Sequence, residues 1–163
     1  MILGVVGDTH NNLLNVEKII NIFNGRNVDK VVHTGDITQA KTLGKFSRLN
    51  CPLLGVYGNN DQGEENLKDT AEQNGFKFQD PPFIVKLNNT NIAIFHEPDG
   101  IENYLKKDSS IDLIIHGHTH RYRNEKIGKV RIINPGECAG IIEGRNSVGS
   151  INLKDLKFER IFF

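Results

Sequence analysis

Half of the six histidines of the chain lie within five positions, in the stretch I-I-H-G-H-T-H at residues 114–120. Closely spaced imidazoles after an aliphatic run are typical ligands of a transition-metal ion. Three imidazoles seldom complete the ligand shell of a metal, so we expect further ligands elsewhere in the chain. Suitable side chains occur in D-T-H at residues 8–10, G-D at 35–36, G-N-N-D at 58–61 and at His96.

The metal-ligand candidates in these motifs number seven: Asp8, His10, Asp36, Asn59, His96, His118 and His120. A single first-row divalent ion takes about four to six ligands, so this set with some water suits two ions. Mixed imidazole and carboxylate ligands favour transition metals, and the absence of cysteine ligands argues against a structural zinc site. We therefore expect two divalent ions, with manganese ahead of nickel, cobalt, iron or zinc.

The spacing within two of the motifs predicts how their side chains point. In an extended segment, residues i and i+2 face the same side. The outer residues of 8–10 and of 118–120 should therefore face the ions, with the threonine between them turned away. By contrast, His33 and His116 each precede a motif inside an apolar run, and we expect them to pack in the interior.

Apolar runs separated by turn residues predict the elements that carry the motifs. The first half of the chain predicts strands at 2–6, 29–33 and 53–57, with helices from Asn11 or Asn12 to Gly25, at 40–49 and at 64–74. This βαβαβ order indicates a parallel sheet. After Pro81-Pro82 we expect strands at 83–87 and 91–95 around a hairpin turn, a helix near 101–107 and a strand at 112–115, followed by short antiparallel strands near 121–126, 130–133, 147–153 and 156–162. The hairpins indicate a second sheet packed on the first within a single domain, residues 1–163.

Each polar motif directly follows one of the predicted strands. Taken singly, D-x-H occurs often by chance, and G-D or G-N-N-D is usually a turn. Open α/β sheets bind ligands beyond the carboxyl ends of their strands, however, so five motifs at strand ends should meet at one rim. This coincidence is what favours a metal site over a set of unrelated turns.

Composition limits the remaining classes of function. Among the 163 residues, 20 basic side chains balance 20 acidic ones, so net charge gives no attraction to nucleic acid or membrane. No apolar stretch approaches the roughly 20 residues of a membrane span. Two cysteines favour a reducing cytoplasm over a disulfide framework. The apolar C-terminus, residues 161–163, fits either a core or an interface of a homo-oligomer.

In this order, the motifs resemble those of the calcineurin-like metallophosphoesterases. The short chain and N-P-G-E-C at 134–138 are more specifically similar to the small single-domain phosphodiesterases of bacteria and archaea. The resemblance implies an α/β fold: a sandwich of two mixed sheets flanked by helices. It also implies two ion sites that share Asp36 as a bridge. The first would contain Asp8, His10, Asp36 and His120, and the second Asp36, Asn59, His96 and His118.

The implied activity is hydrolysis of a small phosphodiester. Two cations about 3.5–4 Å apart would neutralise phosphoryl oxygens and lower the pKa of a bridging water, which attacks as hydroxide. Besides Asp36 and Asn59, the catalytic candidates are Asn60 and Asp61. Many larger relatives carry a general-acid histidine where this chain has Asn60, which cannot donate a proton at neutral pH. We expect Asp61 to orient Asn60 or His10, and the charge of Glu97 to disfavour highly charged substrates.

Two other classes of function remain as alternatives. The fold also serves as a scaffold in the retromer subunit of the vacuolar sorting protein 29 type, but a retired site usually loses ligands and this set is intact. Nuclease subunits for DNA ends resemble it too, but they carry large capping domains and the extra histidine, and this chain has neither.

Overall fold

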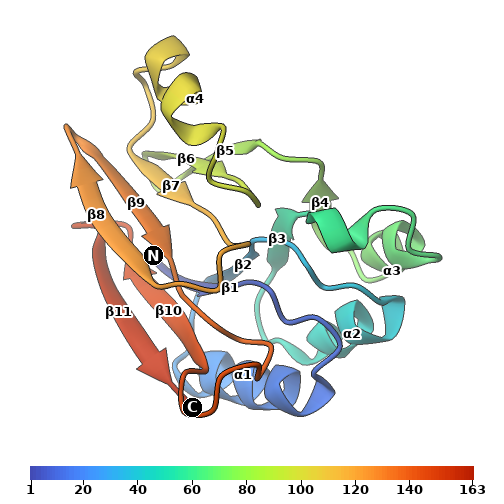
Figure 1. The fold of residues 1–163 in the computed structure, drawn as a ribbon. Helices are drawn as coiled ribbons and strands as arrows, with labels where there is room; N and C mark the ends of the chain where they lie inside the picture. Colours follow the sequence, from blue (N-terminus) through green and yellow to red (C-terminus); the bar gives the residue numbers. More distant parts are fainter.

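Eleven strands form two sheets in the computed structural model, which describes residues 1–163 (Figure 1). The first sheet has the order β11-β10-β1-β2-β3-β4 and the second the order β5-β6-β7-β9-β8. The strands of the first sheet are β1 (Ile2–Val6), β2 (Lys30–His33), β3 (Leu53–Val56), β4 (Lys77–Gln79), β10 (Ser147–Asn152) and β11 (Lys157–Phe162). Those of the second sheet are β5 (Phe83–Leu87), β6 (Thr90–Ile94), β7 (Leu113–Ile115), β8 (Arg123–Ile127) and β9 (Val130–Asn134).

Both sheets are mixed. Strands β1 to β4 run parallel, while β10 pairs antiparallel with β1 and β11 with β10. In the second sheet β6, β7 and β9 run parallel, with β5 and β8 antiparallel at the two edges. The carboxyl ends of β1, β2 and β3 therefore share one edge of the first sheet, and those of β6, β7 and β9 share one edge of the second.

Four helices cover the two outer faces, which gives four layers (Figure 1). Helices α1 (Leu13–Gly25), α2 (Ala40–Lys45) and α3 (Leu67–Gln73) pack on the first sheet, and α4 (Ile101–Lys107) packs on the second. A third cluster of buried aliphatic residues, among them Val5 and Ile94, fills the space between the sheets. The predicted α/β sandwich of two mixed sheets flanked by helices is confirmed.

Helix α1 shows how the sequence specifies these layers. The side chain of Asn12 caps the helix by accepting a hydrogen bond from the backbone N–H of Asn15 at 3.1 Å. Buried Val16, Ile20 and Phe23 recur at the period of one helical face and pack on the sheet.

The second half of the chain departs from the expected arrangement in three places. The hairpin β10–β11 joins the first sheet, where it extends the edge beyond β1, and not the second sheet. Strand β9 lies parallel to β7, so the late strands are not all antiparallel. Strand β4 was not predicted, because three residues with one partly buried phenylalanine are too few for an alternating pattern to be detected.

Helix boundaries also differ from the expected ones. Helix α2 ends at Lys45 and continues as a 3₁₀ turn at Phe46–Arg48, and α3 begins at Leu67 instead of near residue 64. The apolar C-terminus contributes to the core, because Ile161 and Phe163 pack against the cluster under α1, while Phe162 is exposed. None of the helices has the length and apolar character needed to cross a membrane.

Candidate metal centre

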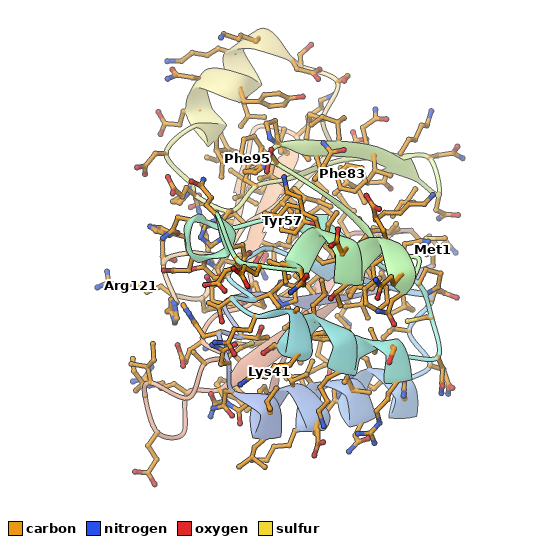
Figure 2. The ribbon with its side chains drawn as sticks, turned by 90° about the vertical axis from the view of Figure 1, so that its right-hand side faces the viewer. Met1, Lys41, Tyr57, Phe83, Phe95 and Arg121 are labelled. Carbon is orange, nitrogen blue, oxygen red and sulfur yellow. The ribbon has the colours of Figure 1, made fainter.

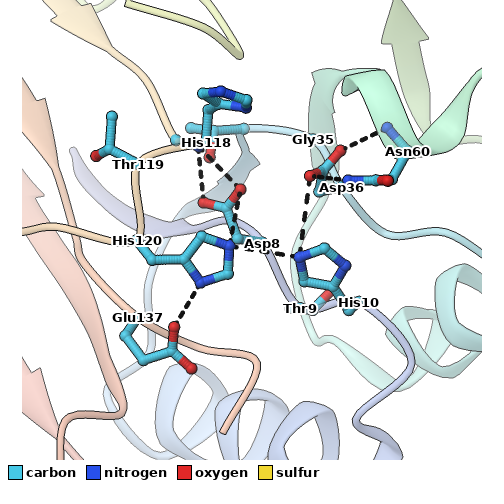
Figure 3. A network of polar contacts seen from close by, with 12 residues as sticks. Asp8, Thr9, His10, Gly35, Asp36, Asn60, His118, Thr119, His120 and Glu137 are labelled. Atoms are coloured by element: carbon cyan, nitrogen blue, oxygen red, sulfur yellow. Dashed lines mark hydrogen bonds and ion pairs between the residues drawn. The ribbon is translucent and has the colours of Figure 1, made fainter. Parts of the chain in front are cut away.

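The seven predicted ligands come together where the edges of the two sheets meet. Those of the first sheet follow β1, β2 and β3, and those of the second follow β6 and β7. The backbone N–H of His118, from the second sheet, donates to both carboxylate oxygens of Asp8, from the first, at 2.9 and 3.0 Å (Figure 3). Residues more than one hundred positions apart are thereby held in one loop cluster.

One group of side chains surrounds His96. Its Nε2 lies 3.4 Å from Oδ1 of Asp36 and 2.8 Å from Oδ1 of Asn59. The Nδ1 atom of His118 lies 3.2 Å from the same nitrogen and 3.1 Å from the Asn59 oxygen. Asp36, His96 and His118 each offer a ligand atom within 4.8 Å of the others. These four residues are the set expected for the second ion.

A second group surrounds His120 (Figure 3). Its Nε2 lies 3.4 Å from Nε2 of His10 and 4.0 Å from Oδ1 of Asp8. The His10 nitrogen in turn lies 3.9 Å from Oδ2 of Asp36. These four residues are the set expected for the first ion, and Asp36 is the member common to both groups.

Hydrogen bonds at the outer nitrogens fix how two of these imidazoles face the centre. Nδ1 of His96 donates to the carbonyl oxygen of Thr34 at 2.8 Å, and Nδ1 of His120 donates to Oε2 of Glu137 at 2.5 Å. In each neutral ring, Nε2 then carries the lone pair and faces oxygen atoms that also accept, those of Asp36 and Asn59 at His96 and that of Asp8 at His120. Lone pairs that face one another in this way are unfavourable unless a cation lies between them, and the mixed imidazole and carboxylate set fits a divalent transition metal.

Burial and neighbouring groups act in opposite directions on the two carboxylates. Burial raises the pKa of Asp8 to about 6, although His96 and His120 oppose that shift. Burial would also raise the pKa of Asp36, but contact with the His96 ring and hydrogen bonds from Asn60 outweigh it and hold the pKa well below its usual range. Asp36 is therefore an anion at neutral pH. The protein compensates the negative charge of the fully buried Asp8 only in part.

The ligand segments are not extended, so the i, i+2 argument for their side-chain direction was wrong. Five of the seven candidates have positive φ angles, which non-glycine residues seldom adopt. The angles are 51° at Asp8, 44° at His10, 56° at Asp36, 68° at His118 and 54° at His120. Each left-handed residue costs about 1–3 kcal/mol unless surrounding contacts impose it, and such residues cluster at functional sites.

Asp61 imposes one of these conformations. Its carboxylate accepts the backbone N–H groups of Asp36 at 2.8 Å, of Ile37 at 2.8 Å and of Thr38 at 2.6 Å, and it also accepts that of Gly58 at 2.7 Å. The expectation that Asp61 orients Asn60 or His10 was therefore wrong about its partners. It shapes the loop that presents Asp36.

Asn60 contacts Asp36 itself. Its backbone N–H donates to Oδ1 of Asp36 at 2.9 Å and its side-chain Nδ2 donates to Oδ2 at 2.7 Å (Figure 3). The exposed Asn60 side chain thus lies at the surface of the centre, where a general acid would have to be.

Glycines of the motifs leave room for the ligands. A Cβ atom at Gly58 would lie 2.2 Å from Oδ1 of Asp36, and one at Gly117 would lie 2.7 Å from Oδ2 of Asp8. The glycines read from the sequence as turn residues are therefore required by close approach to a carboxylate.

His33 and His116 are buried and lie outside the two ligand groups, as expected. His33 accepts the backbone N–H of Gly35 at 3.1 Å and lies 3.2 Å from the hydroxyl of Thr9, so it ties two ligand loops together. Burial lowers the pKa of His33 to about 3 and that of His116 to about 4, which keeps both rings neutral.

The segment N-P-G-E-C contains site residues that sequence reasoning missed. Glu137 holds His120, and Nδ2 of Asn134 donates to the carbonyl oxygen of Gly117 at 2.9 Å and to the hydroxyl of Thr119 at 3.2 Å. Both residues lie at or just after the end of β9. The same strand-end rule that selected the ligands would have found them. Cys138 is a buried thiol in the core.

Comparison with protein families and curated proteins identifies relatives over nearly the whole chain. A family model described as the calcineurin-like phosphoesterase superfamily domain matches residues 1–156. Phosphodiesterase MJ0936 of Methanocaldococcus jannaschii is 34% identical over 167 residues, which cover 99% of this chain and 98% of that protein.

Solved structures show the same fold. The structure of a novel archaeal phosphodiesterase superposes with a TM-score of 0.91 at 32% identity and covers 100% of both chains. Vps29 of Entamoeba histolytica, solved with zinc, superposes with a TM-score of 0.71 at 18% identity and covers 99% of both chains. The second likeness extends to the fold alone.

Proposed function

We propose that this chain, which belongs to the calcineurin-like phosphoesterase superfamily, hydrolyses phosphate diesters with two divalent ions. The observation that carries the proposal is the pair of candidate ligand groups with Asp36 in common. Both groups lie where loops from the two sheets meet. The likeness to a named archaeal phosphodiesterase along the whole chain supports a diester as substrate. Because each ligand group draws on both sheets, residues 1–163 would act as one domain.

Asp8, His10, Asp36 and His120 would hold the first ion, and Asp36, Asn59, His96 and His118 the second. Bound there, the ions would supply neutralisation of the phosphoryl charge and activation of a water molecule. Mixed imidazole and carboxylate ligands suit manganese, with nickel, cobalt, iron and zinc as the other candidates.

Other side chains and backbone groups of the protein would orient the metal ligands and contact the substrate. Glu137 and the Thr34 carbonyl hold His120 and His96 in the ring orientation that directs Nε2 inward. Asp36 brings a full negative charge between the two groups, and Asp61 fixes the loop on which it sits. Asn60 can donate a hydrogen bond to the substrate but no proton at neutral pH, so a poor leaving group would receive little help.

The alternative of a non-catalytic scaffold receives less support. The likeness to Vps29 lies below the identity at which more than the fold can be compared. All seven candidate ligands are present and converge, whereas a surface that only binds a partner does not require them. Two free cysteines, one of them fully buried, fit a cytoplasmic protein.

Titration of manganese into the chelated protein tests the proposal directly. Hydrolysis of bis(4-nitrophenyl) phosphate should rise from background and reach a plateau at about two ions per chain. Asp36→Asn should lose metal and activity together, because one charge shared by both ions is removed. Saturation with metal but no hydrolysis of any diester would leave the scaffold as the better account.

A further inference from the structure

A cavity of about 430 Å³ opens beside the candidate metal centre, on the side of His120. Three arginines, Arg121, Arg145 and Arg160, line it together with Tyr122 and two residues of the centre itself, His120 and Glu137. The cavity is therefore continuous with the group of residues proposed for the first ion. Figure 2 shows Arg121 projecting beyond the ribbon at the edge of the molecule.

None of the three arginines forms an ion pair within the protein. The ion pairs of the other arginines are Arg26 with Glu159, Arg48 with Glu17 and Arg123 with Glu125. Glu137 is the one acidic residue in the lining, and both of its oxygens are engaged, one by His120 and the other by the backbone N–H of Ile141 at 2.7 Å. Three positive charges thus share one cavity with no free carboxylate to balance them.

Arg160 is held in a fixed position. Its guanidinium carbon lies 4.6 Å from the ring centre of Tyr122 and 4.4 Å from that of Phe162, and its Nε donates to the hydroxyl of Ser147 at 3.0 Å. The two terminal nitrogens have no partner in the protein. Burial and the nearby charge of Arg145 lower the pKa of Arg160, and an anion placed between the two arginines would offset both effects.

We infer that this cavity, the arginine subsite, binds a second phosphate group carried on one arm of the diester substrate. A guanidinium matches the geometry of phosphate oxygens with two parallel hydrogen bonds, and a preorganised one loses little entropy on binding. This inference rests on the proposed function, since it places the scissile diester at the adjoining centre. It names the substrate class as a phosphodiester with an additional phosphate on the arm next to His120.

The opposite side of the centre has different chemistry. A cavity of about 390 Å³ there is lined by Asn59 and His96 of the centre, by Tyr57 and Phe95, and by the carboxylates of Asp80 and Glu97. Acidic and aromatic side chains would repel a second anion and suit an uncharged ring. The two arms of the substrate should therefore differ, with the anionic arm on the arginine side.

A matched pair of substrates tests the arginine subsite. The first is thymidine 5′-(4-nitrophenyl phosphate), and the second is the same compound with an added 3′-phosphate. Both release the same nitrophenolate, so the added phosphate is the one difference. We expect kcat/KM to be at least tenfold higher for the second compound, through a lower KM, and the advantage to shrink as salt is raised.

Variants attribute the advantage to the arginines. In the double variant Arg121→Gln with Arg145→Gln, the ratio of kcat/KM between the two substrates should fall most of the way to one, because Arg160 alone remains to bind the added phosphate. Both side chains are exposed and without partners, so the fold should be retained. Arg48→Gln, which removes the same charge far from the cavity, should keep the wild-type ratio. In a third substrate the 3′-phosphate is esterified to another thymidine. Its kcat/KM distinguishes binding of a terminal phosphate from binding of the internal phosphate of a nucleic-acid strand.

An equal kcat/KM for the first two substrates in the wild-type protein would overturn the arginine subsite while leaving the proposed function intact. An advantage that persists in the double variant would do the same. If no diester is hydrolysed with any metal, the proposed function fails, and calorimetry decides the subsite separately. Thymidine 3′,5′-bisphosphate should then bind the metal-free wild-type protein at least tenfold more tightly than the double variant, and equal affinities would reject the subsite.

Discussion

Nδ1 of His120 lies 2.5 Å from Oε2 of Glu137, and Nε2 of the same ring lies 4.0 Å from the Asp8 carboxylate. One carboxylate therefore sets the tautomer and orientation of the ring that the other faces. Glu137 is almost completely buried, and its other oxygen accepts the backbone N–H of Ile141, so its carboxylate is fixed in place. An imidazole oriented by a carboxylate is a stronger and better placed metal ligand than a free one.

Glu137→Gln should weaken metal binding by about 10–100-fold, because the amide oxygen is a poorer acceptor for the Nδ1–H of His120. Competition with a chelator of known affinity measures the change in the dissociation constant for manganese. Glu143→Gln is the matched control, since it removes an exposed charge from the same loop. An unchanged affinity in Glu137→Gln would mean that His120 does not need this orientation, or does not bind metal.

Asp8→Asn should stabilise the metal-free protein at neutral pH while it lowers metal binding. Burial places the pKa of Asp8 at about 6 in the folded protein, above the ordinary value of 3.8, so the folded state holds the proton more tightly than the unfolded state. The contribution of Asp8 to stability is complete below pH 3.8 and is lost as pH rises through about 6. The variant lacks this loss and should gain on the order of 2 kcal/mol at pH 7 relative to pH 4.

Urea unfolding in the presence of a chelator, at a series of pH values between 4 and 8, measures the difference between wild type and Asp8→Asn. Asp69→Asn, at an exposed position on α3, serves as the control and should follow the wild-type curve. A difference between the two proteins that stays constant with pH would contradict the assignment of the shift to Asp8.

The three histidines of residues 116–120 should separate into two kinds. His118→Ala and His120→Ala should lose bound manganese and turnover. His116→Ala should retain most of both and lose about 2 kcal/mol of stability, because it removes a buried ring that Asn134 and Gly117 surround. Metal content by mass spectrometry and a thermal melt of each variant make the distinction. Equal loss of metal in all three would refute the structural role of His116.

The absence of a general acid at Asn60 predicts a steep dependence of rate on the leaving group. Across substituted phenyl phosphodiesters, the logarithm of the rate should fall strongly as the pKa of the leaving phenol rises. Asn60→His should flatten this slope and accelerate poor leaving groups by up to about 10²-fold, because an imidazolium stabilises charge where it develops. A flat dependence in the wild-type protein would show that another residue donates the proton.

The sequence predicted the parts of the site that depend on strand order. Seven ligand candidates follow from polar residues at the ends of apolar runs, and the fold brings them to one edge. The partners of Asp61 and Glu137 did not follow, because a carboxylate that accepts distant N–H groups leaves no periodic pattern in the chain. The left-handed conformations at residues such as Asp8 and His118 were equally unpredictable, since long-range contacts impose them against local preference.

The candidate ligands divide between the two layers of strands, and that division has a consequence for stability. The first layer supplies Asp8, His10, Asp36 and Asn59, the second supplies His96, His118 and His120, and each proposed ion takes ligands from both. An ion bound at either position would cross-link the two sheets at one edge of the sandwich, in addition to any part in hydrolysis. Its removal would loosen the layers at that edge first. The distant edge would stay closed, because the hydroxyl of Thr90 in the second sheet donates there to the carbonyl oxygen of Leu153, just after β10 of the first sheet, at 3.3 Å.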